Sequence, residues 1–326
     1  MCDIDINQFC TKVEQLFSVF GIASKMGSFV SKLHSLPKNE IFRKDTSFGY
    51  FWLISDMENK FFLQLLGEIS IGQNLTKYTS SRSLDYICGY NQQSMTSLVG
   101  MNDSEECLYA SHYMEQRGYD RLLSDSEDIQ YGTMAYITSF TNKEDDLTMW
   151  RLYGDDAKGI ALNFCLNNDL SNNFYLAHVS YAKEDKQHPE LELLLKMMEI
   201  TIGECKFCFK NLYLWRFFFK PYDYKIEDEI RLLYFVDKNS KKTTWIKSAS
   251  GIYTPIIKFP IVDETCDMEE SPLLYPLTLS KVTLGPQFVE AEKNRETISQ
   301  MFKTRFGWTQ SEFQVVISSI SNYKNL

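Results

Sequence analysis

The start of the chain carries apolar side chains at helical spacing. Phe9 and Val13 open a series of apolar residues that recur three or four positions apart, the period of a helix with one buried face. A second apolar segment at residues 48–69 follows Pro37, whose fixed backbone angle interrupts a helix. The pattern predicts a helical N-terminal extension over residues 1–70.

The rest of the chain, residues 71–326, alternates short apolar runs with turns and helices. A long apolar stretch from Pro189 to Phe219 predicts one buried helix, and residues 289–306 predict a last helix capped by Gly307. Strands are expected at residues 75–80, 136–140, 159–164, 174–181, 227–236, 252–261, 277–284 and 313–320. This order favours an α+β fold with a mixed, mainly antiparallel sheet as its core.

One segment places polar side chains at the junctions of predicted elements. In residues 136–164 a strand is expected to end in a polar turn, a short helix follows, and a glycine turn leads into a second strand. The candidate binding residues at these junctions are Ser139, Thr141, Trp150, Arg151 and Tyr153. Binding groups are common on loops held by rigid neighbours, so we expect this segment to contribute most of a ligand site.

A second segment places three charged side chains at the start of a predicted strand. With a period of two, Glu227, Glu229 and Arg231 share one face of this strand, and apolar side chains share the other. Neighbours on one face lie about 6.5 Å apart, twice the rise per residue. Such a face is common on the solvated side of an antiparallel sheet, and it is also suited to the mouth of a cleft. The sequence leaves both interpretations open.

Several short sequence motifs follow one another in a defined order along the chain. They are LTKYTS at residues 75–80, MNDSEE at 101–106, SFT, DDLTMWRLYG and KGIALNF within 139–164, IEDEIRLL at 226–233 and VTLGP at 282–286. This order resembles a bacterial family known as domain of unknown function 2971, over residues 74–323. Membership of such a family implies a role in bacterial stress responses or anti-phage defence.

The chain also resembles, more distantly, the ADP-ribosyltransferase-like fold, which has a split sheet. Residues 227–229 are similar to the Glu-x-Glu word at a strand start in those enzymes, and residues 139–141 are similar to their middle motif. Tyr78, Thr79 and Ser80 stand at the place of their first motif. That motif usually contains a His or Arg, and residues 78–80 contain neither.

This resemblance implies an enzyme that consumes NAD by breaking the bond between nicotinamide and ribose. Glu229 would stabilise the positive charge that develops on the sugar or orient the acceptor, and Glu227 would position or deprotonate the nucleophile. The residues assigned to NAD binding are Tyr78, Thr79, Ser80, Ser139, Thr141, Trp150, Arg151, Tyr153 and Arg231. The hydroxyl groups of Ser139 and Thr141 would hold the ribose, and Trp150 or Tyr153 would stack on nicotinamide. Arg151 or Arg231 would hold the pyrophosphate or merely orient Glu229.

Two other classes of function fit the same residues. A metal-dependent nuclease or phosphoesterase would use the oxygen ligands that Mg²⁺ prefers. Those side chains are Asn102, Asp103, Glu106, Asp145, Glu227 and Glu229, but no ligand motif accompanies them and no metal site is predicted. A non-catalytic sensor or interaction module would use Trp150 and Arg151 only for packing and an ion pair. Dependence on NAD, on Mg²⁺ or on neither separates the three.

Composition narrows the choice of partner. The net charge of −9 and a pI near 5.1 argue against broad nucleic-acid binding, which depends on Lys and Arg neutralising phosphates. The basic turn KNSKK at residues 238–242 is an exception, with a solvated hairpin loop as the simpler interpretation. Without a secretory pattern or an apolar run of about 18 residues, we expect a cytoplasmic protein that does not enter membranes. The acceptor of the reaction is not predicted, and a homo-oligomer is compatible with the sequence.

Overall fold

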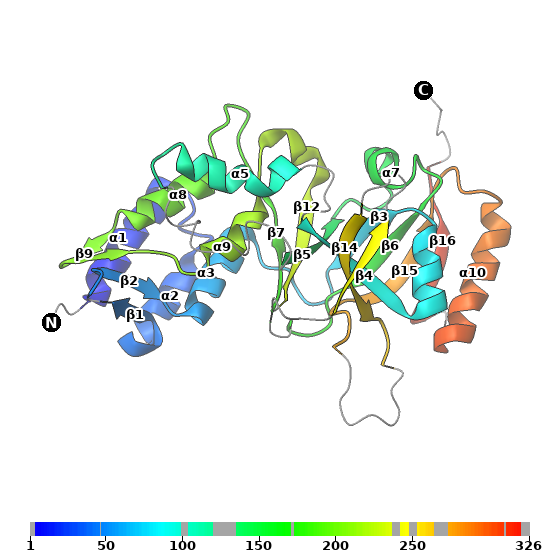
Figure 1. Cartoon of the computed structure of the whole chain (residues 1–326), viewed down its shortest axis with the longest axis horizontal. Coiled ribbons are helices and arrows are strands. Elements are labelled where there is room, and N and C mark those ends of the chain that lie inside the picture. The colour runs from blue at the N-terminus through cyan, green and yellow to red at the C-terminus, as the bar shows by residue number, and fades with distance from the viewer. Residues whose placement is uncertain are drawn as a thin grey trace. The chain divides into compact units, whose positions relative to one another are not determined.

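A computed structural model describes most of the chain (Figure 1), namely residues 4–45, 47–98, 104–119, 135–170, 173–236, 242–247, 253–263, 273–309 and 311–320. The chain divides into two compact units. Unit 1 comprises residues 1–68, 102–131 and 177–226, and unit 2 comprises residues 69–101, 132–176 and 227–326. The chain first passes from unit 1 to unit 2 between residues 68 and 69. The chain then returns to unit 1 twice, so the N-terminal segment forms one unit together with two later segments.

Unit 1 combines helices with small sheets. Its elements are α1 (Ile6–Val19), α2 (Gly27–Ser35), η1 (Lys38–Glu40), β1 (Phe42–Asp45), β2 (Tyr50–Leu53), α3 (Ser55–Leu66), α5 (Ser104–Glu115), β8 (Ser180–Tyr181), α8 (Pro189–Met198), β9 (Thr201–Ile202), β10 (Cys205–Phe207), α9 (Leu212–Trp215), η5 (Arg216–Phe218) and β11 (Phe219–Lys220). One sheet has the order β1-β2-β10-β9, and β11 pairs with β8. Aromatic rings fill the core, as where Phe9 of α1 packs edge to face on Phe51 of β2, with ring centroids 5.8 Å apart.

The expectation that residues 48–69 are helical is wrong for their first part. Tyr50–Leu53 forms β2, which pairs with β1 and β10, and the helix α3 begins only at Ser55. Phe51 and Leu53 are buried, as an alternating strand pattern requires. Because the partner strand β10 comes from much later in the chain, helical spacing within this segment did not decide its backbone.

The single helix expected from Pro189 to Phe219 is also wrong. The helix α8 ends at Met198, and the chain turns at Gly203, where φ is +60°, between the paired strands β9 and β10. The apolar side chains of this stretch are buried as predicted. Burial alone cannot distinguish a helix from a pair of short strands, so the continuous apolar run was misleading.

A buried carboxylate ties α3 to the segment after β10. Glu58 is fully buried, and its two carboxylate oxygens accept hydrogen bonds from the backbone N–H groups of Lys210 at 3.0 Å and Asn211 at 2.6 Å. Burial raises the pKa of Glu58 to about 7, although the two N–H groups and the charge of Lys210 act in the opposite direction.

Glu58 is expected to make the free energy of unfolding fall as the pH rises from about 4.5 to about 7. The folded carboxyl group keeps its proton to a higher pH than the unfolded one, so folding takes up a proton in this window. Raising the pH through the window therefore lowers the free energy of unfolding. The shift corresponds to roughly 3 kcal/mol. Glu58→Gln does not titrate and should show a flatter pH dependence in urea unfolding measured at several pH values. Equal slopes for the two proteins would contradict this assignment.

Unit 2 is built on one large sheet. Its elements are β3 (Asn74–Thr79), α4 (Arg82–Leu84), the π-helix η2 (Asp85–Gly89), β4 (Gln92–Ser97), β5 (Ala135–Thr141), α7 (Leu147–Tyr153), β6 (Ile160–Cys165), β7 (Phe174–His178), β12 (Glu229–Phe235), β13 (Thr243–Lys247), β14 (Tyr253–Pro260), β15 (Thr278–Leu284), α10 (Ala291–Phe306) and β16 (Gln314–Ile317). In the described part of the chain this sheet has ten strands, in the order β13-β14-β4-β5-β3-β6-β15-β16, with β12 on β5 and β7 on β12. The β15–β16 pair is parallel and the neighbouring pairs along the path are antiparallel, which confirms the predicted α+β class with its mainly antiparallel core.

The sheet divides at β5. The strand β12 pairs with β5 from end to end and occupies one edge of it. The other edge is shared, because β4 pairs with β5 at Tyr136 and Ile137, and β3 pairs with it at Thr141 alone. The ladder on this edge is interrupted over residues 138–140. Here the branch through β4 and β14 separates from the branch through β3 and β6. A relationship to the ADP-ribosyltransferase-like fold stays a prediction.

The two faces of this sheet differ in polarity. Apolar side chains of β3, β5, β6 and β12, such as Phe140 and Leu162, form one core together with residues of η2 and α10. The positions between them point to the opposite face and include Thr76, Ser139, Thr141, Asn163, Glu229 and Arg231. The helix α7 packs on that face through Trp150, whose ring lies edge-on to Tyr78 with centroids 4.8 Å apart. We call this surface the polar face.

Candidate functional site

The strand, short helix and strand predicted over residues 136–164 are confirmed as β5, α7 and β6. Asp146 caps α7 by accepting a backbone hydrogen bond at 3.0 Å. Asp145 has a left-handed backbone with φ of +51° and accepts hydrogen bonds from Trp150 Nε1 at 2.8 Å and Ser318 Oγ at 2.6 Å. Burial acts to raise the pKa of Asp145, but its hydrogen bonds prevail and lower it. These bonds hold α7 in place on the polar face.

A buried ion pair stands at the start of β12. Glu229 and Arg231 are 3% and 1% exposed, and Arg231 Nε and Nη2 donate to the two carboxylate oxygens of Glu229 at 2.8 and 2.9 Å. Such a bidentate pair fixes the plane of the carboxylate. Thr141 lies opposite Glu229 on β5, and Ser139 lies opposite Arg231, so all four share the polar face. The interpretation of a solvated charged face is therefore wrong for this pair, and Ser139 is the member exposed to solvent.

Glu227 does not lie on the same strand as Glu229. It is the last residue of the 3-10 helix η6 (Tyr222–Glu227), and Asp228 then adopts a left-handed backbone with φ of +47° before β12 begins. The expected alternation of Glu227 with Glu229 is wrong because this left-handed residue interrupts the strand. Glu227 instead accepts a hydrogen bond from the hydroxyl group of Tyr153. That bond joins α7 to the start of β12.

The predicted site residues divide into two groups. Those that the structure brings together on the polar face or at its edge are Ser139, Thr141, Tyr153, Glu227, Glu229 and Arg231. The others lie in or near the packing around α7 and β3. Tyr78 is buried with its hydroxyl group bonded to the turn before α7, the Thr79 hydroxyl bonds to a serine of α4, Ser80 follows β3, and Arg151 is exposed on α7. Trp150 is completely buried and presents no free ring face, which leaves Tyr153, 45% exposed, as the aromatic side chain at the site.

Two residues of the polar face were missed by sequence reasoning. Thr76 of β3 lies opposite Thr141, and Asn163 of β6 lies opposite Thr76, so they extend a row of polar side chains from Glu229 across the sheet. Asn163 is buried and its Nδ2 donates to Thr76 Oγ1 at 3.0 Å, whereas its Oδ1 has no hydrogen-bond partner among the described residues. A buried acceptor without a donor is unfavourable, so a ligand with an N–H or O–H group would be stabilised there. The sequence feature that could have identified Asn163 is its position as a polar residue inside the apolar strand IALNF.

The side chains proposed as metal ligands do not assemble. Asn102 and Asp103 lie outside the described residues, as does the side chain of Glu106. The oxygens of Asp145 bind α7 and the segment after β16, and those of Glu229 bind its arginine partner. Within the ranges that the structure describes, no group of three or more His, Cys, Asp or Glu side chains could hold a metal ion.

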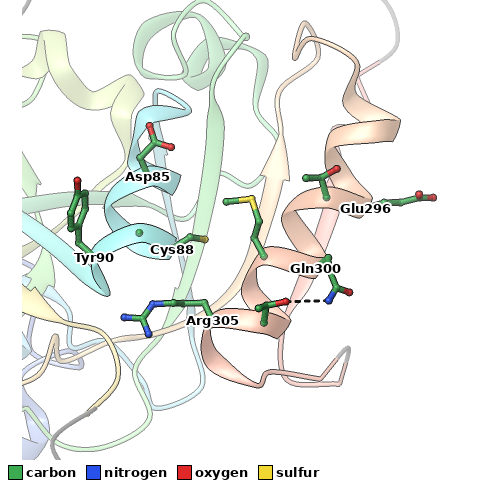
Figure 2. A pocket seen from close by; sticks show the side chains of 10 residues that line it. Asp85, Cys88, Tyr90, Glu296, Gln300 and Arg305 are labelled. Atoms are coloured by element: carbon green, nitrogen blue, oxygen red, sulfur yellow. Dashed lines mark hydrogen bonds between the residues drawn. The ribbon is translucent and has the colours of Figure 1, made fainter.

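A separate groove of about 1060 Å³ lies between η2 and α10. Figure 2 shows its walls, with Asp85, Cys88 and Tyr90 on one side and Glu296 and Gln300 on the other, and the side chain of Arg305 extends from α10 toward the first side. Burial, reinforced by the charge of Asp85, raises the pKa of Cys88 to about 12, so the thiol is neutral and a weak nucleophile. None of the predicted site residues lines this groove, and the candidate chemistry stays with the polar face.

Comparison with known proteins bears on the stretch from α7 to β12. Residues 149–232 match DUF2971, a family described as protein of unknown function. The DUF2971 match includes Tyr153, Glu227, Glu229 and Arg231, and it supports the resemblance predicted from the sequence. No curated protein and no solved structure matches the chain. None of the helices in the described ranges has the length and hydrophobicity that crossing a membrane requires.

Proposed function

We propose that the polar face is the site of an ADP-ribosyltransferase-like enzyme that breaks the bond between nicotinamide and ribose in NAD. The position of Glu229 is the main observation in support. Its carboxylate begins β12, is oriented by Arg231, and lies opposite Thr141 on β5, the strand at which the sheet divides. A fixed carboxylate beside hydroxyl groups at the point where the sheet divides suits a reaction that develops positive charge on a sugar.

The surrounding residues fit the parts of NAD. Arg231 donates one hydrogen bond to each carboxylate oxygen of Glu229 and so orients the carboxylate on the polar face. The hydroxyl groups of Ser139 and Thr141 would bind the ribose, and the unpaired Oδ1 of Asn163 would accept a hydrogen bond from a hydroxyl or carboxamide group. Nicotinamide would stack on the exposed ring of Tyr153.

Glu227 has a role distinct from that of Glu229 in this proposal. It is half-buried at the edge of the polar face and is held by the Tyr153 hydroxyl group. It would orient the incoming nucleophile and accept its proton as the new bond to ribose forms. Glu229, being buried, would act through its charge alone.

A non-catalytic interaction module is the second candidate. The contacts that hold α7 in place support this candidate. Trp150 is buried against Tyr78, and its indole N–H donates a hydrogen bond to Asp145. Such contacts stabilise a rigid surface without requiring any reaction.

Glu229→Gln is expected to lower nicotinamide release from NAD by on the order of 10²-fold, because glutamine keeps the shape of the side chain and removes the charge. Release would be measured with the purified full chain, alone and with cell extract as a source of acceptors. The matched control is Glu292→Gln, since Glu292 is an exposed carboxylate on α10. Equal release by wild type and Glu229→Gln, or no release by folded wild type with extract present, would overturn the proposal. The second outcome would favour the interaction module.

A further inference from the structure

The β13–β14 hairpin exposes aromatic side chains that the fold does not use. Trp245 and Tyr253 are 62% and 64% exposed. In the described part of the chain β13 pairs with β14 alone, so it is an edge strand. The hydroxyl groups of Thr243 and Tyr136 lie 2.7 Å apart, which ties the first residue of β13 to β5. Large aromatic side chains left in water at the end of a sheet are typical of a binding surface.

The exposed aromatic side chains share one face of the hairpin with a lysine. Trp245 pairs with Pro255, and Lys247 pairs with Tyr253, so Trp245, Lys247 and Tyr253 all project from the same side. Lys247 Nζ lies 5.6 Å from the centroid of the Tyr253 ring. No carboxylate of the described residues forms an ion pair with Lys247. We call these three residues the hairpin surface.

The charge of this region is opposite to that of the whole protein. Residues 238–262 contain five lysines and no Asp or Glu, in a chain of net charge −9. Residues 238–241 of the basic turn KNSKK lie outside the described residues. Lys247 is exposed on the hairpin surface, and Lys258 is exposed on the opposite face of β14. A local excess of positive charge attracts a polyanion even when the net charge of the protein is negative.

We propose that the hairpin surface binds single-stranded nucleic acid. Bases would stack on Trp245 and Tyr253, because every base offers a flat π-face, and Lys247 would contact the phosphate backbone. The single-stranded form is favoured because base pairing and stacking in a duplex cover the faces that the two rings would contact. An acidic peptide would match the lysines but has no flat partner for the rings. The surface is small and local, which agrees with a net charge that opposes broad nucleic-acid binding.

The test uses the full chain and fluorescently labelled single strands of DNA and RNA of about 15 nucleotides, followed by anisotropy at low salt. Trp245→Ala and Tyr253→Ala are each expected to weaken binding about tenfold or more. Lys247→Gln is expected to weaken it and to reduce the slope of log affinity against log salt by roughly 0.7, the value for one phosphate contact on a single strand.

Two matched variants distinguish binding at the hairpin surface from nonspecific binding. Phe48→Ala removes an exposed aromatic ring of unit 1, and Lys293→Gln removes an exposed charge on α10. Both should bind as wild type, and all variants should keep the wild-type thermal unfolding midpoint because every changed side chain is exposed. No binding of single strands by wild type at low salt would overturn the proposal, as would equal binding by the hairpin variants. Tighter binding to an acidic peptide or to phosphatidylserine vesicles would overturn it in favour of that partner.

Discussion

Arg231→Met is expected to lower the free energy of unfolding by about 3–5 kcal/mol. The change removes the two hydrogen bonds that Arg231 donates to Glu229 and leaves the carboxylate buried at 3% exposure. An ion that is buried without its counter-ion loses favourable solvation, which destabilises the folded state. Methionine fills much of the volume of the arginine stem, so the loss reports on charge more than on packing. Urea unfolding of wild type and variant at one pH measures it.

Two further variants show whether burial is the cause. Glu229→Gln combined with Arg231→Met removes the uncompensated charge and should recover part of the lost stability. Arg295→Met breaks a comparable pair with Glu292 that is exposed to solvent, and should cost less than about 1 kcal/mol. If Arg231→Met were as mild as Arg295→Met, the ion pair at the start of β12 would not be the buried anchor described above.

Gly159→Ala is expected to be the second severe substitution, lowering the free energy of unfolding by about 3 kcal/mol or preventing soluble expression. A Cβ atom at this position would lie 2.2 Å from the carbonyl oxygen of Thr79 and 2.8 Å from that of Gly154. Both contacts are backbone atoms, so no rotation of a side chain can relieve them. Gly159 also donates to the Gly154 carbonyl oxygen at 2.8 Å and accepts from the N–H of Gly285 at 3.0 Å, which fixes its position.

The control for this prediction is Gly27→Ala. Gly27 begins α2, and a Cβ atom there would meet nothing within 4 Å. Alanine is favoured over glycine in a helix, so this variant should be neutral or slightly stabilised. Thermal unfolding and soluble yield of the two variants, side by side with wild type, give the comparison. A wild-type midpoint for Gly159→Ala would mean that β3 and the turn after α7 are not as closely packed as the structure shows.

In unit 2, the sequence alone was sufficient to predict the elements whose ends are set by residues adjacent in the chain. The strand, short helix and strand over residues 136–164 were predicted because a polar turn precedes the helix and the flanking runs are apolar. The structure identifies Asp146 of that turn as the cap. The last helix was predicted with its end at Gly307, whose φ of +70° is the left-handed cap that glycine favours. Spacing also singled out Glu229 and Arg231 as neighbours on one face.

Tertiary pairing alone decided how these pieces form a site. The polar row joins Glu229, Thr141, Thr76 and Asn163 from four strands that are distant in sequence, and no local pattern specifies which strands will be neighbours. Burial of the ion pair, and of Trp150, also depends on what the rest of the chain places over them. The strand pairs of unit 1 were missed for the same reason, since β2 and β10 meet only in the folded chain. Helix ends and turns are set by a few adjacent residues, whereas sheet partners, and therefore the site, are set by contacts across the whole sequence.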